Sequence, residues 1–384
     1  MSAFLNSFFH PSFADSLPTI YSPTKTTPIY FDQNIADKRF PELHRKLCRT
    51  LQGVESYWKN ELVEAGFEDL RDFPQHVCED EKLALSTKGM EGIDVSIIMP
   101  TKDVSAYLSD LLLEMYTDLT SANIRFEVFA VDDGSTDGTL QILRKFATEH
   151  SSNFYLLESG TGSGAGRARN QVIKGLIEGE YVYFVDADDT FDFVALAKAT
   201  RTAKETGADL LILPYKIEYV HSNYSTTKGM MKADARIWDD IMTKHDSSNS
   251  DLKLAALGLI NYPWKQLTAS ALIHNKGIFF GPTQVQNDVQ FHWTSIAAAQ
   301  NMQFYNQSTC ICTHRLFDSN VRTQLTQVHS SSRLSMMDAL GMTQRALAQQ
   351  GAFDSEEGEQ IFEVYKTFFK IVTKWAEVSR LGTV

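Results

Sequence analysis

The chain contains an apolar run that ends directly in three carboxylates, Tyr181-Val-Tyr-Phe-Val-Asp-Ala-Asp-Asp189. A continuous apolar run of aromatic and β-branched residues is typical of a strand that is buried on both faces. A second run of this kind, Phe126-Glu-Val-Phe-Ala-Val-Asp-Asp133, lies earlier in the chain. Two buried strands that each end in acids predict a sheet whose carboxyl edge carries a nucleotide and metal site.

Strand-like and helix-like segments alternate from residue 95 to residue 215. This alternation predicts a three-layer α/β domain, with a mostly parallel sheet and helices on both of its faces. The expected strands are 95–99, 126–131, 154–157, 181–185 and 209–215, and the expected helices are 106–120, a helix ending at 149, 165–177 and 193–206. Gly207 is expected to end the last of these helices, because glycine readily adopts the left-handed conformation found there.

The chain divides into three regions by pattern. We expect an N-terminal extension at 1–90 that is partly irregular and partly helical, the helical spacing running from Leu43 to Leu62. The α/β domain is expected at 91–320. A C-terminal helical region is expected at 321–384, with helices at 332–349 and 357–380.

Composition excludes some classes of protein. The 384 residues include 36 basic and 48 acidic ones, for a net charge of −12, which argues against a nucleic-acid partner. No apolar run is long enough to span a bilayer, and the first ten residues lack the pattern of a signal peptide. We therefore expect a cytoplasmic protein without a transmembrane segment; the sequence leaves the oligomeric state open.

Four cysteines in a chain of this length do not predict a disulfide framework. Cys310, Cys312 and His314 are spaced two residues apart and would face the same side of a strand, so a zinc site is one interpretation of this segment. Free thiols are the reading that we favour, because no fourth ligand stands at a recognisable spacing.

Five segments in order resemble the family-2 glycosyltransferases, which are inverting enzymes of the GT-A fold. They are VSIIMPTKD, FEVFAVDDGSTDGT, GAGRARNQVIKGLIEGEYVYFVDADD, PWKQL, and GIFF followed by NDVQF, and together they extend over about residues 93–316. The resemblance implies a GT-A domain that takes a nucleotide-diphosphate sugar, most simply a UDP-sugar, and transfers the sugar to an acceptor hydroxyl.

The resemblance assigns the nucleotide-sugar site to residues at three strand ends and one helix. Asp132 and Asp133 match the pair that recognises base and ribose through acceptor oxygens, although acids here could instead compensate a helix dipole. Arg169 matches a position beside the nucleotide, where it could pair with the diphosphate or with an acid of the Asp186 cluster. The remaining members of the implied site are Pro100, Thr101, Asp103 and Asp186.

The glycine-rich stretch Gly160–Gly166 is not a dinucleotide fingerprint, because it follows the third strand instead of the first. Asp186 and Asp188 match the Asp-x-Asp of the family and are implied to hold a divalent metal, whereas a solvated turn is the structural alternative for a short acidic run. Their oxygen ligands favour Mg²⁺ or Mn²⁺.

Asp288 matches the general base of the family, which takes the proton of the attacking hydroxyl; a helix N-cap is the structural alternative. Asn287 stands where the family usually has Glu, which leaves open what that Glu would orient. Trp264 and Lys265 match a segment on the acceptor side, and His314 and Arg315 match a position near the diphosphate.

The sequence therefore predicts a metal-dependent inverting glycosyltransferase. One alternative is a non-catalytic relative that binds a nucleotide sugar or a partner. A nucleotidyltransferase is a weaker alternative, because it would need a glycine-rich basic loop where this chain has Pro100-Thr-Lys-Asp103. The sugar, the acceptor and the linkage are set by a few loop side chains and cannot be predicted.

Overall fold

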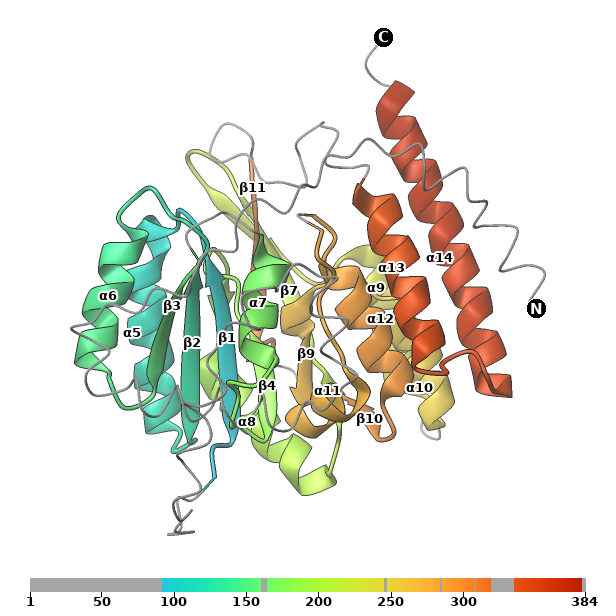
Figure 1. Ribbon diagram of the computed structural model, residues 1–384, viewed down its shortest axis with the longest axis horizontal. Coiled ribbons are helices and arrows are strands. Elements are labelled where there is room, and N and C mark those ends of the chain that lie inside the picture. Colours follow the sequence, from blue (N-terminus) through green and yellow to red (C-terminus); the bar gives the residue numbers. More distant parts are fainter. Residues whose placement is uncertain are drawn as a thin grey trace, which may run out of the picture.

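The computed structural model describes residues 92–159, 164–244, 247–283, 285–307, 309–318 and 335–381. A seven-stranded sheet in the order β10-β6-β9-β4-β1-β2-β3 forms its centre (Figure 1). Neighbouring strands run parallel except where β9 pairs with β4 and β6. The strands are β1 (Val95–Thr101), β2 (Phe126–Asp132), β3 (Phe154–Glu158), β4 (Tyr181–Phe184), β6 (Leu210–Ile212), β9 (Gln266–Ala269) and β10 (Met302–Phe304).

Helices cover both faces of this sheet. The side chains of alternate residues in each strand point to opposite faces, so both faces present apolar side chains to the helices. Ile97 and Met99 of β1 belong to the apolar core shared with α5, α6 and α8, whereas Ile98 belongs to the core shared with α7 and the later helices. The helices are α5 (Ser105–Ser121), α6 (Thr139–Glu149), α7 (Ala165–Ile173), α8 (Phe193–Thr206), α9 (Lys232–Thr243), α10 (Asn249–Leu257), α11 (Ser270–Lys276) and α12 (Asp288–Ala298). The predicted three-layer α/β architecture is confirmed.

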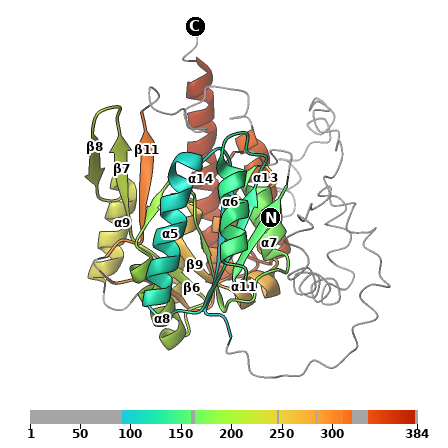
Figure 2. The ribbon, with the colours of Figure 1, turned by 90° about the vertical axis from the view of Figure 1, so that its left-hand side faces the viewer.

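A smaller sheet of four strands, in the order β5-β11-β7-β8, stands to one side of α5 (Figure 2). It holds β5 (Thr190–Phe191), β7 (Tyr215–Val220), β8 (Ser225–Lys228) and β11 (Cys312–Phe317). Its presence corrects one prediction, because the single strand expected at 209–215 is two strands, β6 and β7. Pro214 separates them, since proline has no amide N–H for a sheet ladder, and the chain passes there from one sheet to the other.

Several predicted helices are confirmed with small differences in their bounds. Helix α8 ends at Gly207, which has a left-handed φ of +65° as expected. Helix α7 ends at Ile173, shorter than the predicted 165–177. The C-terminal helices are α13 (Ser335–Gln349) and α14 (Glu356–Leu381), and α13 packs against α12. The predicted helix at 43–62 lies outside the described residues.

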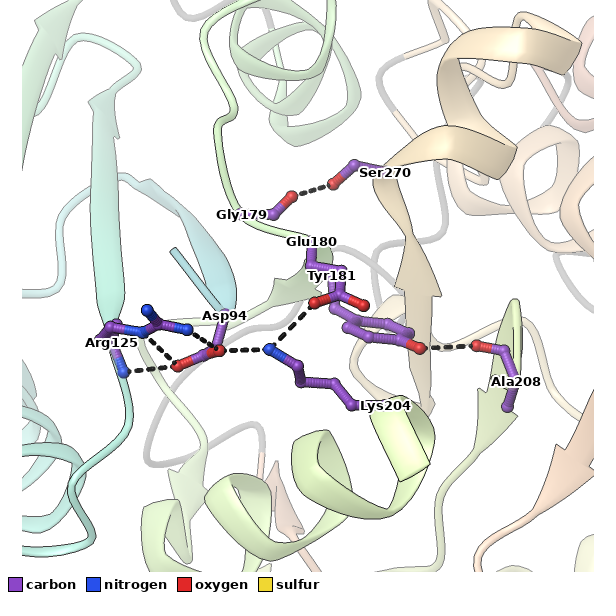
Figure 3. A network of polar contacts seen from close by, with 8 residues as sticks. All are labelled: Asp94, Arg125, Gly179, Glu180, Tyr181, Lys204, Ala208 and Ser270. Carbon is purple, nitrogen blue, oxygen red and sulfur yellow. Dashed lines mark hydrogen bonds and ion pairs between the residues drawn. The ribbon is translucent and has the colours of Figure 1, made fainter. Parts of the chain in front are cut away.

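A polar network fastens the amino ends of β1 and β4 (Figure 3). Asp94, directly before β1, accepts hydrogen bonds from Nη2 and Nε of Arg125 at 2.9 and 3.1 Å and from Nζ of Lys204 at 2.5 Å. Lys204 also pairs with Glu180, directly before β4, at 2.9 Å. Burial alone would raise the pKa of Asp94, but the bonds from Arg125 and Lys204 outweigh it and hold that pKa below its usual range. The network aligns the strands at the edge opposite to the acids.

Candidate active site

The acids that follow β2 differ in how their oxygens are used. Asp132 is 2% exposed, and its Oδ2 accepts the backbone N–H groups of Gly134 and Ser135 at 3.2 and 3.1 Å. Its Oδ1 is buried and has no hydrogen-bond partner among the described residues. A buried carboxylate oxygen without a donor is costly, so this atom is suited to accept a hydrogen bond from a ligand.

Asp133 is tied to the protein on both oxygens. It accepts the hydroxyl of Ser159 at 3.0 Å and the backbone N–H of Gly164, the residue before α7, at 2.7 Å. Asp133 therefore connects the end of β2 to the start of α7.

The predicted residues at the end of β1 and in the loop that follows it lie beside these acids. Thr101 pairs in register with Asp132, and its hydroxyl donates to the carbonyl of Val131 at 3.2 Å. Asp103 is exposed with a left-handed φ of +50°, and its Oδ1 accepts the backbone N–H of Thr136 at 2.7 Å. Pro100 is partly exposed at the end of the same strand. The loops after β1 and β2 are thus joined, and contact of these three residues with a nucleotide stays a prediction.

The segment Asp186–Asp189, here called the acid turn, follows β4 at the same edge of the sheet. The backbone N–H of Asp189 donates to the carbonyl of Asp186 at 3.0 Å and closes the turn. Asp186 and Asp188 are partly exposed, whereas Asp189 is 3% exposed. The acid turn therefore carries two partly exposed carboxylates and one buried carboxylate.

Asp189 fastens the acid turn to β11. Its carboxylate lies 3.0 Å from Nδ1 of His314 and accepts the backbone N–H of Arg315 at 2.7 Å. Burial raises the pKa of Asp189 to about 6, although His314 opposes this shift. Burial of the His314 ring would lower the pKa of that ring, but the charge of Asp189 outweighs burial and raises it. The structure thus gives Asp189 a structural partner that lies far away in sequence.

The side chain of Arg315 lies apart from the acids. Its guanidinium carbon is 4.8 Å from the ring centre of Tyr107 and 4.9 Å from that of Phe317, and its Nε is 3.4 Å from Glu218. Its backbone N–H donates to Asp189 of the acid turn, and contact of its side chain with a diphosphate stays a prediction.

Arg169 joins the acid turn to the segment before α12. It is 4% exposed, its Nη2 donates to Oδ1 of Asp186 at 2.5 Å, and its Nη1 donates to Oδ1 of Asn287 at 3.3 Å. Asp186 belongs to the acid cluster that the sequence offered as one partner of Arg169, and contact of Arg169 with a diphosphate stays a prediction. The bridge brings Asp186 and the residue before Asp288 to one side chain.

Asp288 is the first residue of α12 and is partly exposed. The N-cap is Asn287, so the alternative of Asp288 as the cap is wrong. Burial raises the pKa of Asp288 to about 6, while Arg169 and Lys265 oppose this and Asp186 adds to it. At neutral pH the carboxylate is ionised and has a pKa suited to take up a proton.

Lys265 and Trp264 lie in a short 3-10 helix, η3 (Pro263–Lys265), and each is 1% exposed. Nζ of Lys265 donates to the carbonyl of Ile260, and burial lowers its pKa to about 7 although Asp234 and Asp288 oppose this. Direct contact of these two buried side chains with an acceptor stays a prediction.

Tyr262 is a neighbour of these residues that was not predicted from the sequence. Its partly exposed ring stacks on Trp264 with ring centres 4.6 Å apart, and it lies 4.8 Å from the ring of His314. Burial raises the pKa of Tyr262 well above its usual range, and the nearby charges of Asp189 and Asp234 raise it further. The only available signal was its position directly before the PWKQL segment.

The acid turn carries the two carboxylates of the predicted metal site. Within the described residues, no three His, Cys, Asp or Glu side chains converge as they would in a site built by protein alone. Mg²⁺ commonly uses only one or two carboxylates and completes its shell with water and phosphate. Asp186 and Asp188, two partly exposed carboxylates on one turn, fit that kind of site. Cys310 and Cys312 are free thiols.

Comparison with known proteins is consistent with this geometry. The profile of glycosyl transferase family 2 matches residues 96–250. The poly(ribitol-phosphate) beta-N-acetylglucosaminyltransferase TarS of Staphylococcus aureus is 36% identical over 121 residues, which are 32% of this chain and 21% of that protein. The poly(ribitol-phosphate) beta-glucosyltransferase of Bacillus spizizenii is 27% identical over 192 residues, or 50% of this chain and 27% of that protein. The matches therefore span only about a fifth to a quarter of these relatives.

The fold is shared with a solved structure of S. aureus TarS, residues 1–349, in complex with UDP-GlcNAc. The TM-score is 0.52 at 22% identity, and the match covers 69% of each chain. In the described part of this chain, no helix has the length and apolar character needed to cross a membrane. Residues 96–250 thus match the profile of glycosyl transferase family 2, and the chain shares the GT-A fold of that TarS structure.

Proposed function

We propose that this protein is an inverting glycosyltransferase that moves a sugar from a UDP-sugar to an acceptor hydroxyl. The observation that carries the proposal is the Arg169 bridge, because it joins the acid turn to Asn287 and so to the neighbouring Asp288. A donor site and a base at one edge of the sheet are the two parts that a single displacement needs.

The nucleotide would bind at the ends of β1 and β2. The unpartnered Oδ1 of Asp132 supports a uracil base, whose N3–H is a donor that this oxygen can accept. Asp186 and Asp188 would hold Mg²⁺ or Mn²⁺, which when bound supplies Lewis-acid stabilisation of the leaving diphosphate.

Asp288 would act as the general base. As the acceptor oxygen forms its bond to the anomeric carbon, its proton passes to the Asp288 carboxylate. The bond between that carbon and the diphosphate oxygen breaks on the opposite side, and its electron pair leaves with UDP. The pKa of about 6 leaves Asp288 ionised before the reaction and able to accept the proton at neutral pH.

The relatives named above act on poly(ribitol-phosphate) by their names, so we include this polymer in the acceptor panel. The experiment measures UDP release from UDP-GlcNAc, UDP-glucose and UDP-galactose, with GDP-mannose as the control donor, with and without the polymer. We expect release from at least one UDP-sugar and faster release with an acceptor. Nucleotide binding without release from any donor would favour the non-catalytic alternative.

A further inference from the structure

The loop that precedes Asp288 is held by three neighbouring residues of α7. We call this loop the base loop; its described ends are Phe280–Gly281 on one side and Gln286–Asn287 on the other. The backbone N–H of Gly281 donates to the carbonyl of Asn287 at 2.7 Å, so the two ends are bonded to each other. Holding one end therefore also holds the other.

Asn170 holds the first end. Its Nδ2 donates to the carbonyl of Phe280 and its Oδ1 accepts the N–H of Phe280, both at 2.9 Å, and the side chain is 7% exposed. The ring of Phe280 packs against Phe291 of α12, with ring centres 4.4 Å apart, and the Arg169 guanidinium lies 4.9 Å from the Phe280 ring centre. A buried reciprocal pair of this kind fixes both position and orientation.

Arg169 and Gly166 hold the second end. Arg169 donates to Oδ1 of Asn287, and the Cα of Gly166 lies so close that a Cβ there would be 2.6 Å from Cβ of Asn287 and 2.7 Å from the carbonyl oxygen of Gly281. Only glycine fits at this approach without a shift of the base loop.

The backbone of the loop is strained where it meets Asp288. Gln286 has a left-handed φ of +61°, which residues with a side chain rarely adopt. Such a conformation persists only where the surroundings determine it, and it is common where a catalytic group is held in place. The contacts from α7 provide such surroundings.

We propose that Gly166, Arg169 and Asn170 of α7 form a clamp that positions Asp288 against the acid turn. Arg169 is the positioning residue that joins the two halves, since it alone among these three also binds Asp186. Asn287, in place of the usual Glu, serves the clamp as a neutral acceptor. The proposal rests on the proposed function, because it assigns the clamp to the base of that reaction.

The test compares Asn287→Ala, Asn287→Asp and Asn170→Ala in the full chain at pH 8, where Asp288 is ionised. Asn287→Ala and Asn170→Ala should each lower kcat by about 10- to 100-fold, because small misplacements of a catalytic group have effects of this size. The Kd for UDP should stay within about threefold of wild type, since Asn170 binds Phe280 and Asn287 binds Arg169, at the base loop and not at the proposed nucleotide site. Asn287→Asp keeps the acceptor oxygen for Arg169 and should retain most of the turnover.

Asn301→Ala is the matched control. Asn301 also uses its amide to bridge backbone carbonyls, those of Thr206 and Gly207 at 3.0 Å each, but at the amino edge of β10. It should lower the melting temperature without lowering kcat, which separates a stability effect from a positioning effect.

Turnover within twofold of wild type in both alanine variants would overturn the clamp. An equal loss of UDP affinity and kcat would also overturn it, because the contacts would then serve donor binding. Asp288→Asn in the same assay separates the two proposals. If Asp288→Asn loses turnover and the alanine variants do not, only the clamp fails; if Asp288→Asn keeps turnover, the proposed function fails and the clamp with it.

Discussion

Replacing Asp132 by Asn should change which base the protein binds. In the structure the backbone N–H groups of Gly134 and Ser135 both point at Oδ2 of Asp132. In the variant the two backbone N–H groups will hold the oxygen of the new amide side chain at the position of Oδ2, because an NH₂ group at that position would face two donors. The amide nitrogen must then lie where the unpartnered Oδ1 now lies, so a donor replaces an acceptor.

The size of the effect follows from that exchange. A hydrogen bond to a charged group contributes about 1.5–3 kcal/mol, and placing the amide N–H opposite the uracil N3–H removes this bond. At about 1.4 kcal/mol for each factor of ten, the Kd for UDP should rise roughly 10- to 150-fold. The cytosine N3 is an acceptor, so the affinity for CDP should fall much less or increase.

Calorimetric titration of UDP and CDP into both proteins is the assay. Asp137→Asn is the matched control, because Asp137 follows the same strand but accepts the N–H groups of Thr139 and Ser105 and has no part in the proposed site. UDP affinity within threefold of wild type in Asp132→Asn, with no change in the ratio of UDP to CDP binding, would refute base recognition by Asp132.

Three further predictions follow from single features of the structure. Asp94→Asn should lower the free energy of unfolding by about 1–3 kcal/mol in urea titrations at pH 7. The pKa of Asp94 is lower in the folded protein than in the unfolded chain, so this difference should shrink as the pH falls below about 4. A difference that does not change with pH would contradict the network. Gly207→Ala should lower the free energy of unfolding by about 1 kcal/mol through its φ of +65° alone, since no atom crowds the new Cβ. Gly229→Ala, where the new Cβ enters open space, should lower it by less than half of that. Chelation of divalent ions, or Asp188→Ala, should weaken UDP binding at least tenfold in calorimetry, and equal binding with and without Mn²⁺ would argue against the metal.

The sequence was sufficient to predict the layered α/β fold, because the buried strands are continuous apolar runs and acidic or turn-forming residues mark their ends. Gly207 ended α8 as expected, since only its lack of a side chain makes that backbone conformation inexpensive. The acids that follow β2 and β4 could be placed at one edge because the strands are parallel. These inferences depend only on local pattern and strand direction.

The interactions between distant segments could not be predicted in this way. Nothing near Asp189 indicates that it binds His314, because that pairing depends on how β11 joins the second sheet. Arg169 had two chemically reasonable partners, and only the packing of α7 against the base loop selects Asp186 and Asn287. Pro214 lies inside the single strand expected at 209–215, and no local pattern there indicates that the chain passes into another sheet.

The most direct test of the proposed mechanism is the turnover of Asp288→Asn measured beside its affinity for UDP. General-base catalysis contributes about 10²–10⁴-fold, so kcat should fall by that factor. The Kd for UDP should stay within about threefold, because Asp288 begins α12 and the nucleotide is proposed to bind at the ends of β1 and β2. A variant that keeps more than about a tenth of the wild-type turnover would show that Asp288 is not the base and would contradict the account.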